Sequence, residues 1–211
     1  LVVTRLLHGR SGTTLFGPAA RALNDFWRTA LPISALWIVL LPLSASDPNV
    51  GRHLNLGQLL VWLPLALPGL LVQTGSEELL FRGYLQQQLA ARFHSPLVWA
   101  VLPSLLFGAL HYAPAEFGPN ALLMTAWATL FGLFAADLTA RTGSLGAAMG
   151  FHFATNFAAV FLVGLYGNLD GLALFNLVIN TRDPAQVIPF LTLDLLAMVV
   201  SWLLARLALR C

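Results

Sequence analysis

The sequence contains no lysine, a single cysteine and few charged residues of any kind. Charged residues make up 9% of its 211 positions, whereas about 25% is usual for a soluble domain. Cys211 alone excludes an intrachain disulfide and a thiolate metal cluster. The net charge of +2 is small and scattered, so we expect no nucleic-acid partner. Hydrophobic residues, by contrast, reach 58%, which is typical of a protein embedded in a lipid bilayer.

Several apolar stretches approach the length needed to cross a membrane. A helix of about 20 residues spans the roughly 30 Å hydrocarbon layer. The candidate spans lie near 30–45, 56–75, 96–112, 121–138, 144–166 and 187–206. Segment 76–92 is amphipathic, which favours a separate helix that is half embedded or lies at the membrane surface. The sequence therefore predicts an all-α, polytopic transmembrane bundle with about six to eight membrane helices.

The arginines predict the orientation, because cytoplasmic loops hold the excess of positive charge. We expect residues 1–29 to form an N-terminal cytoplasmic segment and residues 30–211 a single transmembrane domain. With six crossings and the N-terminus in the cytoplasm, only two arginines lie on the opposite side of the membrane, at positions 52 and 182. If 76–92 crossed the membrane completely, everything after it would invert and the arginine distribution would become poorer. We expect a multi-pass integral membrane protein, in the plasma membrane of a prokaryote.

Two of the three glutamates, Glu77 and Glu78, are adjacent. An ionisable group inside a membrane segment costs roughly 2.5–3.5 kcal/mol on insertion scales, so each one indicates a functional site. Glu78 and Arg82 are four residues apart and share one helix face, which predicts an intrahelical ion pair with a supporting role. Glu77 lies about 100° round the helix without a nearby cation on its own helix, so we expect it to be the general base. A purely structural alternative is a helix start capped by Ser76, with acidic residues in its first turn.

Two histidines lie in apolar stretches, His111 and His152. Either one alone would fit an interhelical hydrogen bond. His152 and Asn156 are one helical turn apart, so an imidazole and a carboxamide face the same side of a helix. A glutamate, a histidine from a second helix and a His/Asn pair from a third form a credible site for activating water and stabilising an oxyanion. Gly146 and Gly150 have the spacing of close helix packing, and we expect that role for them.

Three motifs follow one another on successive apolar helices. They are EExxxR with Glu77, Glu78 and Arg82, FxxxH with Phe107 and His111, and HxxxN with His152 and Asn156. In this order they resemble the CPBP family, the CAAX-processing and bacteriocin-processing intramembrane proteases related to type 2 CAAX prenyl endopeptidases. The resemblance covers residues 76–160, the motif core, and makes 30–211 a protease domain.

The resemblance implies a helical membrane fold with a conical internal cavity and hydrolysis of a peptide bond. It implies that Glu77 activates water, that His111 assists, and that His152 and Asn156 steady the oxyanion. Phe107 belongs to the supporting residues. The implied partners are lipids and a membrane-embedded peptide or lipidated protein, of prenylated CAAX type or bacteriocin type.

Two catalytic chemistries remain open. Glu77, His111 and His152 are acceptable zinc ligands, and the family has been described both as metalloproteases and as glutamate-dependent proteases. The sequence has no HExxH, and a glutamate-activated water needs no metal. We therefore predict the glutamate mechanism and keep zinc at these three residues as its alternative.

Two other functions are compatible with a helical membrane protein. The first is a non-catalytic scaffold or bacteriocin-immunity protein that retains the fold; the intact Glu77, His111, His152 and Asn156 argue against it. The second is a small transporter with a Glu/His proton relay, for which we expect an inverted repeat and broken half-helices. The sequence shows neither feature.

Overall fold

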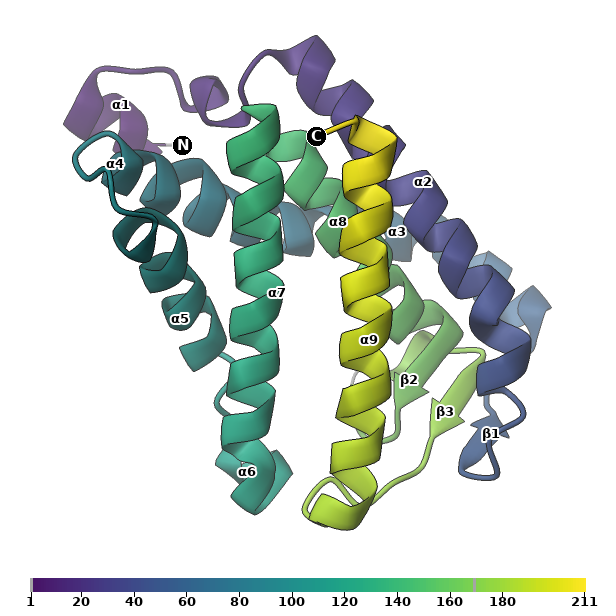
Figure 1. Cartoon of the computed structure of the whole chain (residues 1–211). Helices are drawn as coiled ribbons and strands as arrows, with labels where there is room; N and C mark the ends of the chain where they lie inside the picture. The colour runs from purple at the N-terminus through teal and green to yellow at the C-terminus, as the bar shows by residue number, and fades with distance from the viewer. Residues whose placement is uncertain (1, 169) are drawn as a thin grey trace.

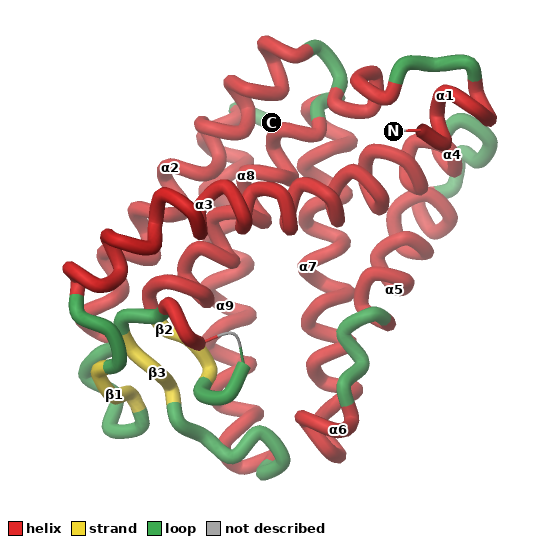
Figure 2. Tube along the Cα trace, turned by 180° about the vertical axis from the view of Figure 1, so that it is seen from behind, coloured by secondary structure: helices red, strands yellow, loops and turns green. Residues whose placement is uncertain are grey.

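Five helices are long and apolar enough to cross a membrane in residues 2–168 and 170–211, the part of the chain that the computed structural model describes. They are Ala19–Ser44, Leu56–Ala90, Pro114–Thr142, Leu145–Leu162 and Pro184–Leu209. The protein is therefore an α-helical, multi-pass integral membrane protein, as the composition predicts. Figure 1 shows the helices as one bundle, and in Figure 2 the helix that begins at Leu56 runs obliquely across it.

The bundle is built from nine α-helices among the described residues. They are α1 (Val2–His8), α2 (Ala19–Ser44), α3 (Leu56–Glu78), α4 (Gln87–Ala90), α5 (Leu102–Ala109), α6 (Pro114–Phe117), α7 (Ala121–Thr142), α8 (Leu145–Phe157) and α9 (Pro184–Leu209). Three π-helical stretches adjoin them, at Leu79–Gln86, Leu97–Val101 and Ala158–Leu162. Short 3-10 turns lie at Gly12–Phe16, Gly118–Asn120 and Asp170–Leu172.

A small sheet that the all-α expectation missed lies at one end of the bundle. Its strands are β1 (Val50–Arg52), β2 (Val163–Leu165) and β3 (Phe175–Leu177), in the order β1-β3-β2. β1 runs antiparallel to the central strand and β2 runs parallel to it. The expected span 144–166 is therefore too long, because the chain changes from helix to strand after the π-helical stretch.

The expected span at 96–112 is also wrong in its length. Its helix covers Leu97–Ala109, about 20 Å at ~1.5 Å per residue, which is shorter than the hydrocarbon layer of roughly 30 Å. The helix ends in turns closed by the backbone N–H of His111 on Gly108 and of Tyr112 on Ala109. Five long spans and this shorter apolar helix replace the six long spans of the sequence prediction.

Segment 76–92 is not a separate helix. It continues α3, so that one helix runs from Leu56 to Ala90. Ser76 is not a cap, since its hydroxyl donates to the carbonyl of Gln73 at 2.8 Å inside this helix. Arg82 lies inside the bundle, with 1% of its side chain exposed.

The first span begins at Ala19, well before the expected residue 30. Arg21, which falls in the expected N-terminal segment 1–29, forms an ion pair of 3.7 Å with Asp25 one turn later in this helix. The same turns pack closely on α8. A Cβ atom on Gly146 would lie 1.8 Å from the carbonyl oxygen of Ala22, and one on Gly150 would lie 2.5 Å from that of Phe26. The packing role expected for the two glycines is therefore confirmed.

Gly146→Ala is expected to destabilise the protein strongly, because the added methyl would overlap the backbone of α2 and force the two helices apart. The thermal unfolding midpoint of the detergent-solubilised protein measures the effect. Gly69→Ala is the matched control, since a Cβ atom there has no neighbour within 4 Å in the described structure. Equal midpoints for the two variants would contradict the close packing of α2 on α8.

Asp137 joins α7 to α9 near the end of the bundle that holds α1. Its carboxylate accepts from Arg141 at 2.7 Å and from the indole N–H of Trp202 at 3.0 Å.

The two ends of the bundle hold different elements. Helix α1 and the C-terminal end of α9 lie at one end, whereas the sheet and α6 lie at the opposite end (Figure 1).

Cysteine labelling is expected to place the α1 end of the bundle in the cytoplasm. Most arginines lie at this end, and the cytoplasmic side of a membrane protein holds the excess of positive charge. In a Cys211→Ser background, Ala91→Cys should react only with reagent on the cytoplasmic side and Ala115→Cys only with reagent outside. Both positions are exposed on the protein surface. Reaction of Ala115→Cys from the cytoplasm would reverse the orientation.

Candidate active site

Glu78 is the centre of a buried polar cluster. Its side chain is 0% exposed, and its Oε1 accepts from Arg82 Nη1 at 2.9 Å and from His152 Nδ1 at 2.8 Å. Its other oxygen, Oε2, has no hydrogen-bond partner among the described residues. The ion pair predicted between Glu78 and Arg82 is confirmed. The bond to His152 links α3 to α8 and was not predicted.

The Arg82 guanidinium lies between this carboxylate and two aromatic rings. Its carbon is 4.7 Å from the ring centroid of Phe107 and 5.8 Å from that of Phe81. Phe107 is itself buried, with 2% of its surface exposed. A cation on an aromatic face is stabilised most where water is excluded. Arg82 and Phe107 therefore form one packed unit behind Glu78, which fits their expected supporting roles.

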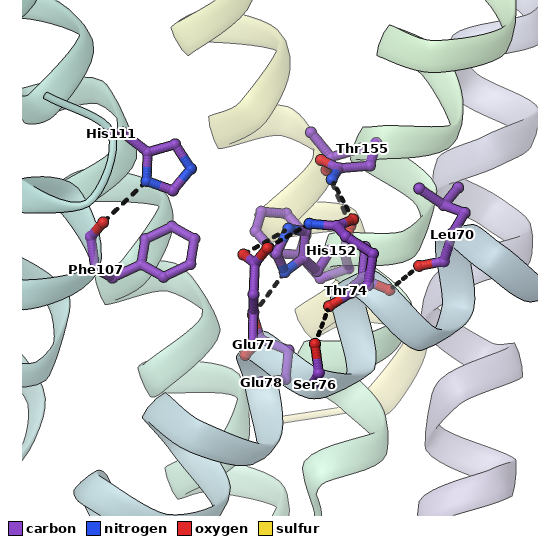
Figure 3. Close-up of polar contacts among 12 residues, drawn as sticks. Leu70, Thr74, Ser76, Glu77, Glu78, Phe107, His111, His152 and Thr155 are labelled. Carbon is purple, nitrogen blue, oxygen red and sulfur yellow. Dashed lines mark hydrogen bonds and ion pairs between the residues drawn. The ribbon is translucent and has the colours of Figure 1, made fainter. Parts of the chain in front are cut away.

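Glu77 has different surroundings from its neighbour. Its side chain is 32% exposed, and its Oε2 lies 3.9 Å from Nε2 of His152. This separation is too long for a direct hydrogen bond and suits two atoms that contact the same water molecule. Figure 3 shows the His152 ring beside both glutamates. One imidazole thus faces the buried carboxylate through Nδ1 and the open carboxylate through Nε2.

Gln73 connects Glu77 to Asn156, and the sequence analysis missed it. Its Nε2 donates to Oε1 of Glu77, while its Oε1 accepts from Asn156 Nδ2 at 3.3 Å. His152 and Asn156 thus lie on one face of α8, as expected, but they bond to different partners. A signal was present in the sequence: Gln73 is a polar residue in an apolar stretch, one helical turn before Glu77.

His111 lies farther from the glutamates, at the end of α5. Its Nδ1–H donates to the carbonyl of Phe107 at 2.9 Å, and the two rings are 4.7 Å apart. This bond leaves Nε2 as a hydrogen-bond acceptor in the neutral ring. Among the described residues, no hydrogen bond joins His111 to Glu77 or His152. Figure 3 shows its ring apart from the Glu77 carboxylate.

Phe131 on α7 completes the aromatic surroundings of the two histidines. Its ring centroid lies 4.7 Å from that of His152 and 5.8 Å from that of Phe107. Phe107 in turn is 6.0 Å from His152. The imidazole of His152 is therefore held by packing as well as by Glu78. Phe131 belongs to none of the three motifs, and nothing in its sequence position distinguishes it from other apolar residues of α7.

A comparison with protein families matches the part of the chain that holds these residues. Residues 56–158 match the family model described as type II CAAX prenyl endopeptidase Rce1-like. This match covers just under half of the chain, so residues 56–158 are similar to that family. The Rce1-like segment begins with the first residue of α3 and ends just after α8. It thus contains every motif residue discussed above, together with Gln73 and Phe131.

A curated relative also matches the chain. It is the uncharacterized protein YyaK of Bacillus subtilis (strain 168), 31% identical over 130 residues, which is 60% of this chain and 44% of the relative. The chain therefore spans less than half the length of this relative. No solved structure matches the chain significantly.

The zinc alternative requires three ligands close together. Within the described residues, no three His, Cys, Asp or Glu side chains lie close enough together to hold a metal ion. Glu77, His111 and His152, the ligands considered for zinc, are not gathered into such a group. The Rce1-like segment instead combines a buried Glu–Arg–His cluster with one accessible carboxylate.

Proposed function

We propose that the chain is an intramembrane endopeptidase in which Glu77 activates water to hydrolyse a peptide bond. The observation that carries this proposal is the contrast between two adjacent carboxylates. Glu78 is fully buried and bonded to Arg82 and His152, whereas Glu77 is 32% exposed and faces the same imidazole at 3.9 Å. Neighbouring acidic groups with different surroundings commonly divide supporting and catalytic roles.

In the first step, Glu77 takes a proton from a water molecule as the water oxygen bonds to the carbonyl carbon of the substrate. The carbonyl π electrons move to oxygen, and the resulting oxyanion is stabilised by the second N–H of Asn156 and by His152, whose Nε2 donates to it when the ring carries both protons. His111 accepts a hydrogen bond from the water through Nε2. In the second step, the oxyanion collapses, the C–N bond breaks, and Glu77 passes its proton to the departing amine. Water supplies every atom that the products gain.

We propose a membrane-associated substrate for this reaction. The residues that would touch it lie on helices embedded among lipids, and the matched family is described by its action on CAAX prenyl proteins. A peptide with a lipidated CAAX-type end is therefore the first substrate class to test. A bacteriocin-type leader peptide is the second.

The test is cleavage of a library of membrane-anchored peptides, with and without a prenylated end, by the purified protein in liposomes. Mass spectrometry should detect new peptide ends with the wild type and none with Glu77→Ala. Preference for the prenylated half would support the CAAX-type substrate. Peptides that bind the wild type without any cleavage would instead support the non-catalytic scaffold.

Activity is expected to survive removal of divalent metals, because the proposed base is a carboxylate and the site residues form no metal-binding group. Cleavage after dialysis against a strong chelator measures this. Three results together would establish a metalloprotease: loss of activity on chelation, recovery of activity with zinc, and stoichiometric zinc in the pure protein.

A further inference from the structure

We propose that Gln73 is a positioning residue that holds Glu77 and Asn156 in one hydrogen-bonded unit across α3 and α8. This inference rests on the proposed function. Its basis is the chain of two hydrogen bonds from Asn156 Nδ2 to Gln73 Oε1, and from Gln73 Nε2 to Glu77 Oε1. Asn156 and Gln73 are 83 positions apart in sequence, so the contact joins two separate membrane helices.

The direction of both hydrogen bonds follows from one fact. An ionised carboxylate only accepts hydrogen bonds, so Gln73 presents its NH₂ group to Glu77. The carbonyl oxygen of Gln73 then faces Asn156, which must donate from its own NH₂ group. The orientation of the two carboxamides is therefore set by the charge of Glu77.

This arrangement leaves the reactive atoms free. Gln73 occupies Oε1 of Glu77, and Oε2 is the oxygen that faces His152 at 3.9 Å. Asn156 uses one N–H on Gln73 and keeps a second N–H for a substrate oxyanion. Gln73 thereby fixes the base and the oxyanion donor relative to each other, which is a requirement for rapid reaction.

Gln73 is also separate from the buried cluster. Its own surface is exposed, whereas Glu78 and Arg82 are almost completely buried. Replacing Gln73 therefore removes two hydrogen bonds without leaving a buried charge uncompensated. A change in activity at this position would report on positioning, because the fold does not depend on an exposed carboxamide.

The kinetic test compares Gln73→Leu with Gln88→Leu. Gln88 lies on the same long helix, accepts from Arg92 at 3.1 Å and takes no part in the site. Gln73→Leu should lower kcat by about 10- to 100-fold, the range for losing a hydrogen bond to a charged group, with KM nearly unchanged. Gln88→Leu should match the wild type. Combining Gln73→Leu with Asn156→Ala should cost less than the product of the two single effects, since the residues act as a unit.

A spectroscopic test is independent of cleavage. The chain has only three glutamates, so infrared spectra of protein labelled with isotopic glutamate can resolve the carboxylate band that disappears in Glu77→Gln. Gln73→Leu should shift this band and leave the others in place. An unmoved band would overturn the inference whether or not the protein cleaves peptides. Unchanged kcat in Gln73→Leu, beside an active wild type and an inactive Glu77→Gln, would overturn it too. Absence of cleavage by the wild type would count against the proposed function alone.

Discussion

Glu77→Gln is expected to lower kcat by about 10²–10⁴-fold, the usual contribution of a general base, while the fold and substrate binding persist. The carboxamide keeps the shape of the side chain, and its oxygen still accepts from Gln73, but it no longer takes a proton from water. Turnover and equilibrium binding of a cleavable peptide measure the two effects separately. Asn156→Ala should be milder, since one oxyanion donor is worth about 10²–10³ in rate.

The matched control for this substitution is Glu116→Gln. Glu116 lies in α6, at the end of the bundle that holds the sheet, and accepts from Asn168. The same chemical change should leave turnover intact there. Equal losses in the two variants would point to a general effect of removing a carboxylate, and undiminished turnover in Glu77→Gln would remove Glu77 from the mechanism.

Arg82→Ala is expected to lower the yield of folded protein sharply. The substitution leaves Glu78 buried with its charge uncompensated, at a cost of roughly 3–5 kcal/mol, against a total stability of about 5–15 kcal/mol for a typical protein. It also removes the cation that packs on Phe107. The monodisperse fraction after detergent extraction, and its thermal unfolding midpoint, measure the loss.

Arg141→Ala provides the control for this loss. It breaks another i,i+4 pair, with Asp137, but the Arg141 side chain is 43% exposed, so the cost should stay below about 1 kcal/mol. A folded, fully stable Arg82→Ala variant without activity would show that the guanidinium acts on the substrate or the oxyanion. Its role would then be catalytic rather than supporting.

The contacts that could be predicted from the sequence are local ones. Glu78 and Arg82 meet because a helix brings positions four apart together, and the spacing of Gly146 and Gly150 marks a helix surface without side chains. The composition was likewise sufficient to predict a helical bundle in a membrane. Each of these conclusions needs only the geometry of one helix and the cost of placing charge in lipid.

The remaining features depend on how separate helices are rotated against each other. His152 reaches Glu78, and Asn156 reaches Gln73, only because α8 lies against α3 in one particular register. A sequence pattern on one helix does not specify its rotation against another helix. The sheet was missed for a related reason: its three-residue strands pair across distant parts of the chain and are too short to show alternation.

The most direct test of the account is a single-turnover cleavage in water labelled with heavy oxygen, with hydroxylamine added in a parallel reaction. Direct attack by a Glu77-activated water predicts one heavy oxygen in the new carboxylate of the peptide, no label on the enzyme and no hydroxamate. It also predicts that this product nearly disappears with Glu77→Gln. A hydroxamate at the new peptide end, or heavy oxygen in the side chain of Glu77, would show a covalent acyl-enzyme and contradict the account.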